Sequence, residues 1–370
     1  MIVRLGITIA LLVGACPALA TTTQLPGLVR EPLKLAVSLP DGSKAELEAL
    51  VTRPDAPGRF PLAMINHGLP RDPIAAVRMA PEAYSSPAIV FAQHGYAAVV
   101  VNRRGFGLSS QPLDLPSGAC DDRDYMKPAR AEAVDILAAL AALRREPWLD
   151  PDQIVLVGHS AGGLAALAAA TDAPAGVVGI VDFSGGLGSP MAGMVCSPQH
   201  LVATVHEFGG AAHIPSLWIF AQNDGFFGPA IARQMFGAYT AAGAPAELDA
   251  APPYGHDGHL LIFAPTPALW WPRVAQFLDQ LHLPTRLIAN VPALAELPDP
   301  PDLDARGKAA FAFYIHTRDY EKAFATDGKG HYANIIAQRT QEDAEAAALA
   351  HCESRGWACK IYAVGNTLIP

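Results

Sequence analysis

Apolar positions in the first hundred residues change from an alternating pattern to short continuous runs. Alternation over residues 33–54, on either side of an Asp-Gly turn, predicts an antiparallel hairpin at the edge of a sheet. The runs at 60–68 and 96–105 do not alternate, which is typical of strands buried on both faces. Residues 81–95 between them predict a helix, so these three segments form a βαβ unit.

The alternation of strands and helices continues to residue 281. Residues 127–147 carry apolar side chains at helical spacing and end in proline, which predicts an amphipathic helix. Further strands are expected at 153–158, 176–185, 216–224 and 245–255, and further helices at 229–243 and 267–281. This order predicts an α/β fold with a doubly wound, mostly parallel sheet.

A proline-rich segment divides the chain. Residues 287–303 have the composition of a linker, so we expect a large domain over 28–286 and a small α+β module over 304–370. In the module, Thr340 and the acidic residues after it predict the start of a helix. A chain of 370 residues with 51% apolar and 16% charged residues can bury a sizeable core.

The first 20 residues have the pattern of an export signal. Arg4 precedes a short apolar stretch, and Ala18-Leu19-Ala20 is the small-x-small pattern that signal peptidase cleaves. The pattern predicts a periplasmic or secreted bacterial protein; a lipoprotein anchored through Cys16 is the minor alternative. The apolar stretch is shorter than the roughly 20 residues that a membrane span needs, and no later segment is a convincing span.

Four cysteines remain after removal of this signal, and an even number in an oxidising compartment permits two disulfides. Cys352 and Cys359 are close in sequence, so a local bridge between them is expected. That pairing leaves Cys120 and Cys196 as the second pair. Four buried free thiols are the alternative.

Charge and motif content limit the partners. The formal net charge is −9 and the basic residues form no run, so nucleic acid and anionic membranes are not expected partners. A small neutral or apolar substrate fits this surface better. The chain has no glycine-rich phosphate loop in its first βαβ unit, no HExxH motif and no cysteine set spaced for zinc, so no cofactor or metal is expected.

A glycine-serine-glycine turn lies between the strand at 153–158 and an alanine-rich helix. Gly158-x-Ser160-x-Gly162 in this context is the pattern of a nucleophile elbow, where a strained turn holds the serine hydroxyl above the sheet. The amide of Ala161 then lies at a helix N-terminus, where it can donate to a developing oxyanion. A helix N-cap is the alternative role for this serine.

A serine nucleophile needs a histidine to accept its proton and a carboxylate beside that histidine. Asp224 ends a buried strand in an Asn-Asp-Gly loop at the carboxyl edge of the sheet and is the preferred acid. Asp182, at the end of the preceding strand, is the alternative. Two histidines follow, His256 and His259.

Three further motifs resemble those of a known family. They are His67-Gly68-Leu69-Pro70 after the strand at 60–68, the RGxGxS turn at 104–109, and Asp257-Gly258-His259-Leu260. With the elbow and the order serine, aspartate, histidine, residues 30–285 resemble an α/β-hydrolase, nearest to the dienelactone-hydrolase-like carboxylesterases. The dienelactone hydrolases use cysteine where this chain has Ser160, so lactone specificity does not carry over.

The resemblance implies roles for individual residues. The amide of Leu69 would be the second oxyanion donor, and His259 rather than His256 would be the base, while His67 and the 104–109 turn would be structural. Phe226, Phe227 and a short loop over 185–214 would shape the pocket.

The expected function is exported serine hydrolysis of a small-molecule carboxylic ester through an acyl-enzyme. One alternative is a peptidase of the prolyl-oligopeptidase type, although the chain lacks the N-terminal propeller of those enzymes. Another is a non-catalytic binding protein on a hydrolase scaffold, with the C-terminal module as its working part. The sequence indicates neither the acyl length nor the oligomeric state.

Overall fold

The computed structural model describes residues 22–110, 112, 117–292 and 294–370. The predicted signal peptide over residues 1–20 and the alternative lipid site at Cys16 lie outside the described residues. Within the described ranges, no helix is both long and apolar enough to cross a bilayer.

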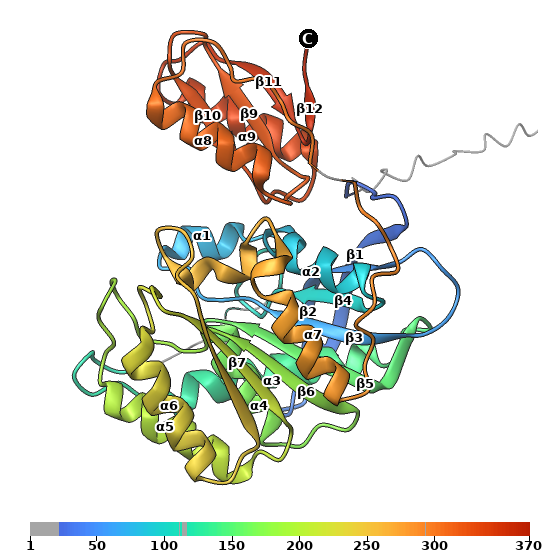
Figure 1. Cartoon of the computed structure of the whole chain (residues 1–370), viewed down its shortest axis with the longest axis vertical. Helices are drawn as coiled ribbons and strands as arrows, with labels where there is room; N and C mark the ends of the chain where they lie inside the picture. Colours follow the sequence, from blue (N-terminus) through green and yellow to red (C-terminus); the bar gives the residue numbers. More distant parts are fainter. Residues whose placement is uncertain (1–21, 111, 113–116, 293) are drawn as a thin grey trace, which may run out of the picture.

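The larger part of the chain is built on one eight-stranded sheet with the order β1-β2-β4-β3-β5-β6-β7-β8 (Figure 1). The strands are β1 (Leu28–Ser38), β2 (Lys44–Pro54), β3 (Phe60–Asn66), β4 (Ala97–Val101), β5 (Leu149–His159), β6 (Val177–Phe183), β7 (Ser216–Ala221) and β8 (Ala246–Ala251). The first two form the predicted hairpin, and β2 is antiparallel to β4. From β4 to β8 all neighbours are parallel, so the predicted mostly parallel sheet is confirmed.

Helices cover both faces of this sheet. They are α1 (Pro73–Arg78), α2 (Ser85–Gln93), α3 (Met126–Leu143), α4 (Ala161–Ala170), α5 (Pro198–Ala211), α6 (Pro229–Ala241) and α7 (Trp271–Gln280), with short 3₁₀ helices η1 (Pro81–Tyr84), η2 (Gly258–Phe263) and η3 (Pro267–Leu269). Side chains of α3 to α6 pack on one face, and those of α2, η2 and α7 pack on the other.

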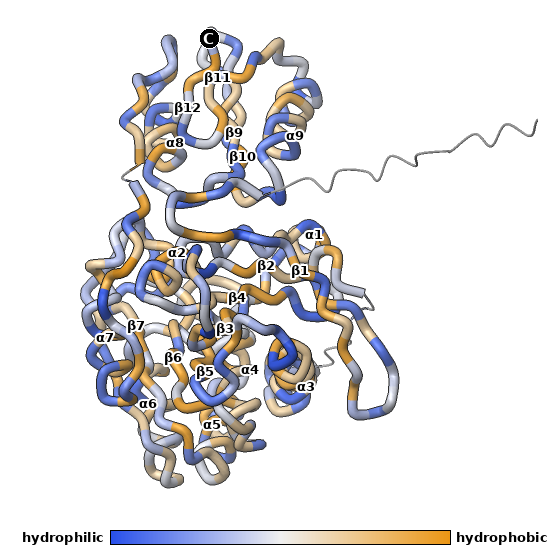
Figure 2. The backbone as a smooth tube through the Cα atoms, turned by 90° about the vertical axis from the view of Figure 1, so that its right-hand side faces the viewer, coloured by the Kyte–Doolittle hydropathy of each residue, from blue (hydrophilic) through white to orange (hydrophobic). Residues whose placement is uncertain are grey.

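The alternation of side chains along the strands explains this arrangement. On β5, Ile154 and Leu156 point to the α3–α6 face, whereas Val155 and Val157 point to the opposite face. Each of these fully buried side chains contributes roughly 1.5–3 kcal/mol of hydrophobic stabilisation. Apolar residues are accordingly concentrated in the central strands (Figure 2).

Residues 185–214, expected to be a short loop, contain the helix α5, so that expectation is wrong. Pro198 occupies the first turn of α5, and Leu201, Val205 and Phe208 bury one face of it against the core.

The C-terminal module has its own sheet and core. It consists of α8 (Ala305–His316), β9 (Ala323–Thr326), β10 (Tyr332–Ile335), α9 (Gln341–Glu353), β11 (Lys360–Val364) and β12 (Thr367–Leu368). Its four antiparallel strands have the order β10-β9-β11-β12, and the module lies beyond the α1 and α2 end of the larger part (Figure 1). Phe311, Tyr314 and Phe324 form the centre of its aromatic core.

The segment between α7 and α8 packs against the larger part rather than running free. Its Ile288 amide donates to the Gln93 carbonyl over 2.8 Å, and Val291 is buried with Leu25, Ile89 and Tyr320. The proline-rich composition therefore gives an extended segment that is fixed by apolar contacts.

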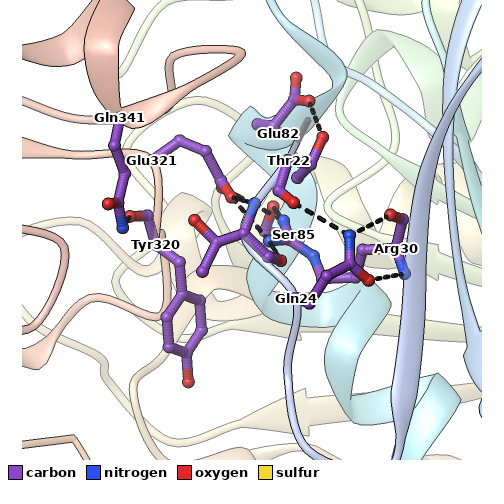
Figure 3. Close-up of polar contacts among 9 residues, drawn as sticks. Thr22, Gln24, Arg30, Glu82, Ser85, Tyr320, Glu321 and Gln341 are labelled. Atoms are coloured by element: carbon purple, nitrogen blue, oxygen red, sulfur yellow. Dashed lines mark hydrogen bonds and ion pairs between the residues drawn. The ribbon is translucent and has the colours of Figure 1, made fainter. Parts of the chain in front are cut away.

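A buried ion pair joins the module to the first strand (Figure 3). The guanidinium of Arg30 donates to both carboxylate oxygens of Glu321 over 2.7 and 3.2 Å, and to Ser85 Oγ over 2.8 Å. The Thr23 amide also donates to Glu321 over 2.9 Å. Because both charged side chains are fully buried, water stabilises neither charge, and each charge is stabilised by the other.

The described residues include two disulfides, Cys120–Cys196 and Cys352–Cys359, which are the pairs expected from the sequence. The first joins the segment before α3 to the segment before α5. The second closes the turn between α9 and β11.

Candidate active site

Ser160 occupies a strained turn between β5 and α4. Its φ of 56° and ψ of −123° lie in a region that costs a non-glycine residue roughly 1–3 kcal/mol. A Cβ atom at Gly158 would lie 2.4 Å from the Gly163 Cα, and one at Gly162 would lie 2.2 Å from the Asn66 carbonyl oxygen. The turn therefore requires glycine at both positions, as the elbow pattern predicts.

Two backbone amides beside Ser160 are free to donate. Ala161 is the first residue of α4, and Leu69 lies in the loop after β3. Within the described ranges, neither amide donates to another protein group. A Cβ at Gly68 would come within 3.1 Å of the Ser160 Cβ, so the β3 loop passes directly over the elbow. The two amides can therefore stabilise negative charge near the serine hydroxyl.

Asp224 and His259 form a hydrogen-bonded pair at the carboxyl edge of the sheet. The His259 Nδ1 atom lies 3.2 and 3.1 Å from the two carboxylate oxygens of Asp224. The amides of Phe226 and Phe227 each donate to Asp224 Oδ1 over 2.8 Å. Burial raises the pKa of Asp224, but the hydrogen bonds and the charge of His259 outweigh it and hold this pKa below its usual range.

Asp257 fixes the segment that carries this histidine. Its carboxylate caps η2 by accepting from the His259 amide over 3.0 Å, and it accepts from the Gly225 amide over 2.8 Å. One side chain therefore ties the loop after Asp224 to the loop that carries His259.

The alternative acid and base lie elsewhere. Asp182 is buried beneath the start of α4, where a Cβ at Gly163 would lie 2.0 Å from its Oδ1 atom. Burial raises the pKa of Asp182 well above its usual range, which favours a neutral carboxyl. His256 is exposed and lines a different cavity from Ser160. The structure thus pairs Asp224 with His259. Neither the alternative acid, Asp182, nor the alternative base, His256, belongs to this pair.

Ser160 and His259 line one cavity of about 250 Å³ together with Leu69. Within the described residues, no hydrogen bond joins the serine hydroxyl to the imidazole. Catalytic hydrogen bonds are often long or unformed in enzymes without substrate, so the absence of this bond does not exclude the pair.

A chain of hydrogen bonds links the loop after β3 to the backbone of His259. The Gly68 amide donates to the Tyr84 hydroxyl oxygen over 2.7 Å, and that hydroxyl lies 2.8 Å from His159 Nδ1. His159 Nε2 lies 2.9 Å from the His259 carbonyl oxygen. Since a carbonyl only accepts, Nε2 carries the proton of the neutral ring, and Tyr84 must donate to Nδ1.

Burial lowers the pKa of His159 to about 3, so the ring stays neutral at working pH. Neither Tyr84 nor His159 was recognised from the sequence. The position of His159 directly before Ser160 was the available signal, but its partners come from distant segments.

An aromatic and cationic wall borders the candidate base. The ring of Phe226 stacks on His259 with centroids 4.2 Å apart, and the guanidinium of Arg71 lies 4.1 Å from the Phe226 centroid. Arg71, Arg123 and both phenylalanines line a cleft of about 350 Å³ that also contains Ser160. The segment before α5 supplies the opposite wall of this cleft, including Cys196.

The two motifs expected to be structural make buried backbone contacts. His67 Nε2 accepts from the Arg103 amide over 3.1 Å, and its protonated Nδ1 therefore donates to the Gly68 carbonyl over 2.7 Å. At Gly107, where φ is +56°, a Cβ would lie 2.3 Å from the Met79 carbonyl oxygen. His67 therefore fixes the loop after β3, and the 104–109 turn packs tightly against Met79.

Across the part of the chain that the structure describes, no three His, Cys, Asp or Glu side chains are placed to hold a metal ion.

The comparisons with known proteins add a family match. A sequence model of the prolyl oligopeptidase family matches residues 82–177, which include the elbow. No curated protein matches the chain in sequence.

Solved structures with similar folds include hydrolases of several kinds. A Klebsiella pneumoniae protein assigned as a dienelactone hydrolase is 19% identical, with 64% of this chain and 89% of that chain covered and a TM-score of 0.43. An acetyl xylan esterase from Paenibacillus sp. R4 is 16% identical, with 70% of this chain and 89% of that chain covered and a TM-score of 0.46. An acylaminoacyl peptidase from Pyrococcus horikoshii is 15% identical, with 72% of this chain and 43% of that chain covered and a TM-score of 0.48.

The strand order, with the antiparallel second strand and the elbow after β5, is that of the α/β-hydrolase fold. The fold expected from the sequence is therefore confirmed.

Proposed function

We propose that this α/β-hydrolase-fold chain is an exported serine hydrolase that cleaves carboxylic esters of small molecules. Ser160 is the nucleophile, His259 the general base and acid, and Asp224 the carboxylate that orients the imidazole. The amides of Leu69 and Ala161 hold the oxyanion.

The Asp224–His259 pair carries the proposal. Because Nδ1 of His259 faces a carboxylate, Nε2 is the nitrogen left to accept the Ser160 proton. The carboxylate also stabilises the imidazolium that forms when the proton transfers. The strained turn at Ser160, with its positive φ, supplies the nucleophile. Two backbone amides beside it that donate to no other protein group supply the oxyanion donors that acyl transfer needs.

The reaction then follows from the positions of these groups. Ser160 Oγ attacks the ester carbon as His259 takes its proton, and the carbonyl oxygen becomes an oxyanion held by the two amides. Collapse expels the alcohol, which takes the proton from His259 and leaves an acyl-serine. Water, deprotonated by the same histidine, attacks the acyl group, and Ser160 regains its proton as the acid leaves.

Three observations support an ester of modest size and an exported enzyme. The cleft of about 350 Å³ contains Phe226 and Phe227, which suit a short acyl or alcohol group. The two disulfides are compatible with an oxidising compartment, as is the signal pattern of residues 1–20.

We further propose a hydrolase domain over 28–286, a linker over 287–303 and a module over 304–370.

A peptidase is the second candidate, favoured by the match of residues 82–177 to the prolyl oligopeptidase family. Chromogenic esters of increasing acyl length, assayed beside an aminoacyl-proline anilide, discriminate the two. We expect hydrolysis of short esters and at most slow release of the anilide. Faster turnover of the anilide would contradict the ester proposal and support the peptidase.

A further inference from the structure

The largest of the cavities described here lies between the larger part of the chain and the C-terminal module. Its volume is about 480 Å³, against about 350 Å³ for the cleft that contains Ser160. Residues 83–86 and 254–265 form one side, and residues 313–337 of the module form the other. Ser160 and His259 do not line it, so it is separate from the candidate active site.

Large apolar side chains from both sides face this cavity. Leu260 is 49% exposed and Phe313 is 58% exposed, although most side chains of their size in this protein are buried. Phe263 and Ile336 add apolar surface from the two sides. An apolar molecule in the cavity would remove this surface from water, which stabilises binding by roughly 25 cal/mol per Å². Ligand sites often have this size and lie between structural units.

The polar groups of the cavity favour an uncharged ligand. Two carboxylates, Asp257 and Asp319, line it and would repel an anion. The imidazoles of His256 and His316 can each donate or accept one hydrogen bond when neutral. A strongly cationic ligand would lose its hydration against the apolar walls. An aromatic or alkyl molecule with one hydrogen-bonding group can pack against the apolar walls and pair with one of the two imidazoles.

The wall of this cavity also positions His259. Asp257 accepts from the amides of His259 and Gly225 while its side chain borders the cavity, and Leu260 directly follows His259. A ligand that presses on Asp257 or Leu260 therefore acts on the segment that carries the base.

We propose that this cavity is a second binding site, which takes an uncharged, mainly apolar small molecule and thereby changes the turnover of the candidate active site. The claim that the cavity binds a ligand does not depend on the proposed function. The claim that the ligand changes turnover rests on the proposed function.

Titration with N-phenyl-1-naphthylamine, a neutral fluorescent probe, tests the site in the full-length mature protein. We expect saturable binding that persists after a fluorophosphonate has blocked Ser160. The Phe313→Asp variant should weaken binding at least about tenfold, since it places a charge in the apolar wall. Leu349→Asp is the matched control, because Leu349 is 42% exposed on α9 and does not line the cavity.

Equal probe affinity in Phe313→Asp and the wild type would overturn the site, and so would loss of binding after Ser160 is blocked. For the turnover part, saturating probe should change kcat for a short ester at least about twofold in the wild type and in Leu349→Asp, and not in Phe313→Asp. Binding without any change in kcat would overturn that part. Failure of the fluorophosphonate to label Ser160 would contradict the proposed function instead, and the comparison of the two variants would still test the binding site.

Discussion

The hydroxyl of Tyr84 donates a hydrogen bond to His159 Nδ1 over 2.8 Å and thereby connects two parts of the candidate active site. On one side the hydroxyl oxygen accepts from Gly68, the residue before the Leu69 amide. On the other side His159 donates to the carbonyl of His259. One connected group of buried side chains therefore holds both the loop of Leu69, proposed to donate to the oxyanion, and the backbone of His259, the proposed base.

Removal of this hydroxyl should slow catalysis. Tyr84→Phe leaves the Gly68 amide and His159 Nδ1 without their hydrogen-bond partner. An unsatisfied buried polar group reduces stability by roughly 1–3 kcal/mol, and the loop that carries Leu69 should become less rigid. We expect kcat for a short ester to fall about tenfold or more with little change in KM, because the oxyanion donors act in the transition state.

Tyr96→Phe is the matched control, because the Tyr96 hydroxyl is also buried but donates to the Pro284 carbonyl away from the cleft. That variant should lose stability and keep its kcat. Unchanged kcat in Tyr84→Phe would show that the hydrogen bonds are only structural.

Asp224 and Asp182, both buried, should respond differently to amide replacement. Asp224→Asn removes the carboxylate beside His259, and a loss of about 10³–10⁴ in kcat is expected by analogy with other triads. Burial raises the pKa of Asp182 well above its usual range, so an uncharged amide is a close replacement, and activity of Asp182→Asn should stay within about twofold of the wild type. A large loss in Asp182→Asn with an active Asp224→Asn would reverse the assignment of the acid.

Stability should depend on pH through Glu82. Burial raises the pKa of this carboxyl from 4.5 to about 8 in the folded protein. The folded state therefore binds a proton more tightly than the unfolded state, and this contribution is fully present below pH 4.5. It is lost as pH rises from about 4.5 to about 8.

We expect Glu82→Gln, which stays neutral, to weaken the decline of the unfolding free energy over this pH range. Chemical denaturation at several pH values measures the effect. Parallel pH profiles for the wild type and Glu82→Gln would contradict it.

The ion pair between Arg30 and Glu321 should dominate attachment of the module. Glu321→Gln leaves a buried guanidinium without its counter-charge, which costs about 3–5 kcal/mol. The free energy of unfolding should fall, and residues 284–304 should become more sensitive to protease.

The exposed pair of Lys34 and Glu46 provides the control, because its side chains are 72% and 51% exposed. Lys34→Met should change stability by less than about 1 kcal/mol. Equal effects in Glu321→Gln and Lys34→Met would show that the buried pair does not fix the module.

Local patterns were enough to predict the alternating fold and the positions proposed for catalysis. Ser160, Asp224 and the Leu69 loop each follow a buried strand, and parallel strands bring their carboxyl ends to one edge. The hydrogen bonds of Tyr84 and His159 were not predicted, because they join residues 16, 75 and 100 positions apart. Neither was the Arg30–Glu321 pair, whose partners are separated by 291 positions. Such contacts depend on tertiary packing, which residue spacing does not encode.

Helix α5 is a different case. Pro198 begins it, and Leu201, Val205 and Phe208 follow at helical spacing, so the sequence did carry a helix signal. Polar and small residues between them hid this periodicity.

Covalent labelling with a fluorophosphonate most directly tests the claim that Ser160 is an activated nucleophile. We expect stoichiometric labelling of the wild type at Ser160, found by mass spectrometry of the modified peptide, and full labelling of His256→Ala. Ser160→Ala should not label, and His259→Ala should label far more slowly because its serine has no base. An unlabelled wild-type protein with native circular dichroism would contradict the account.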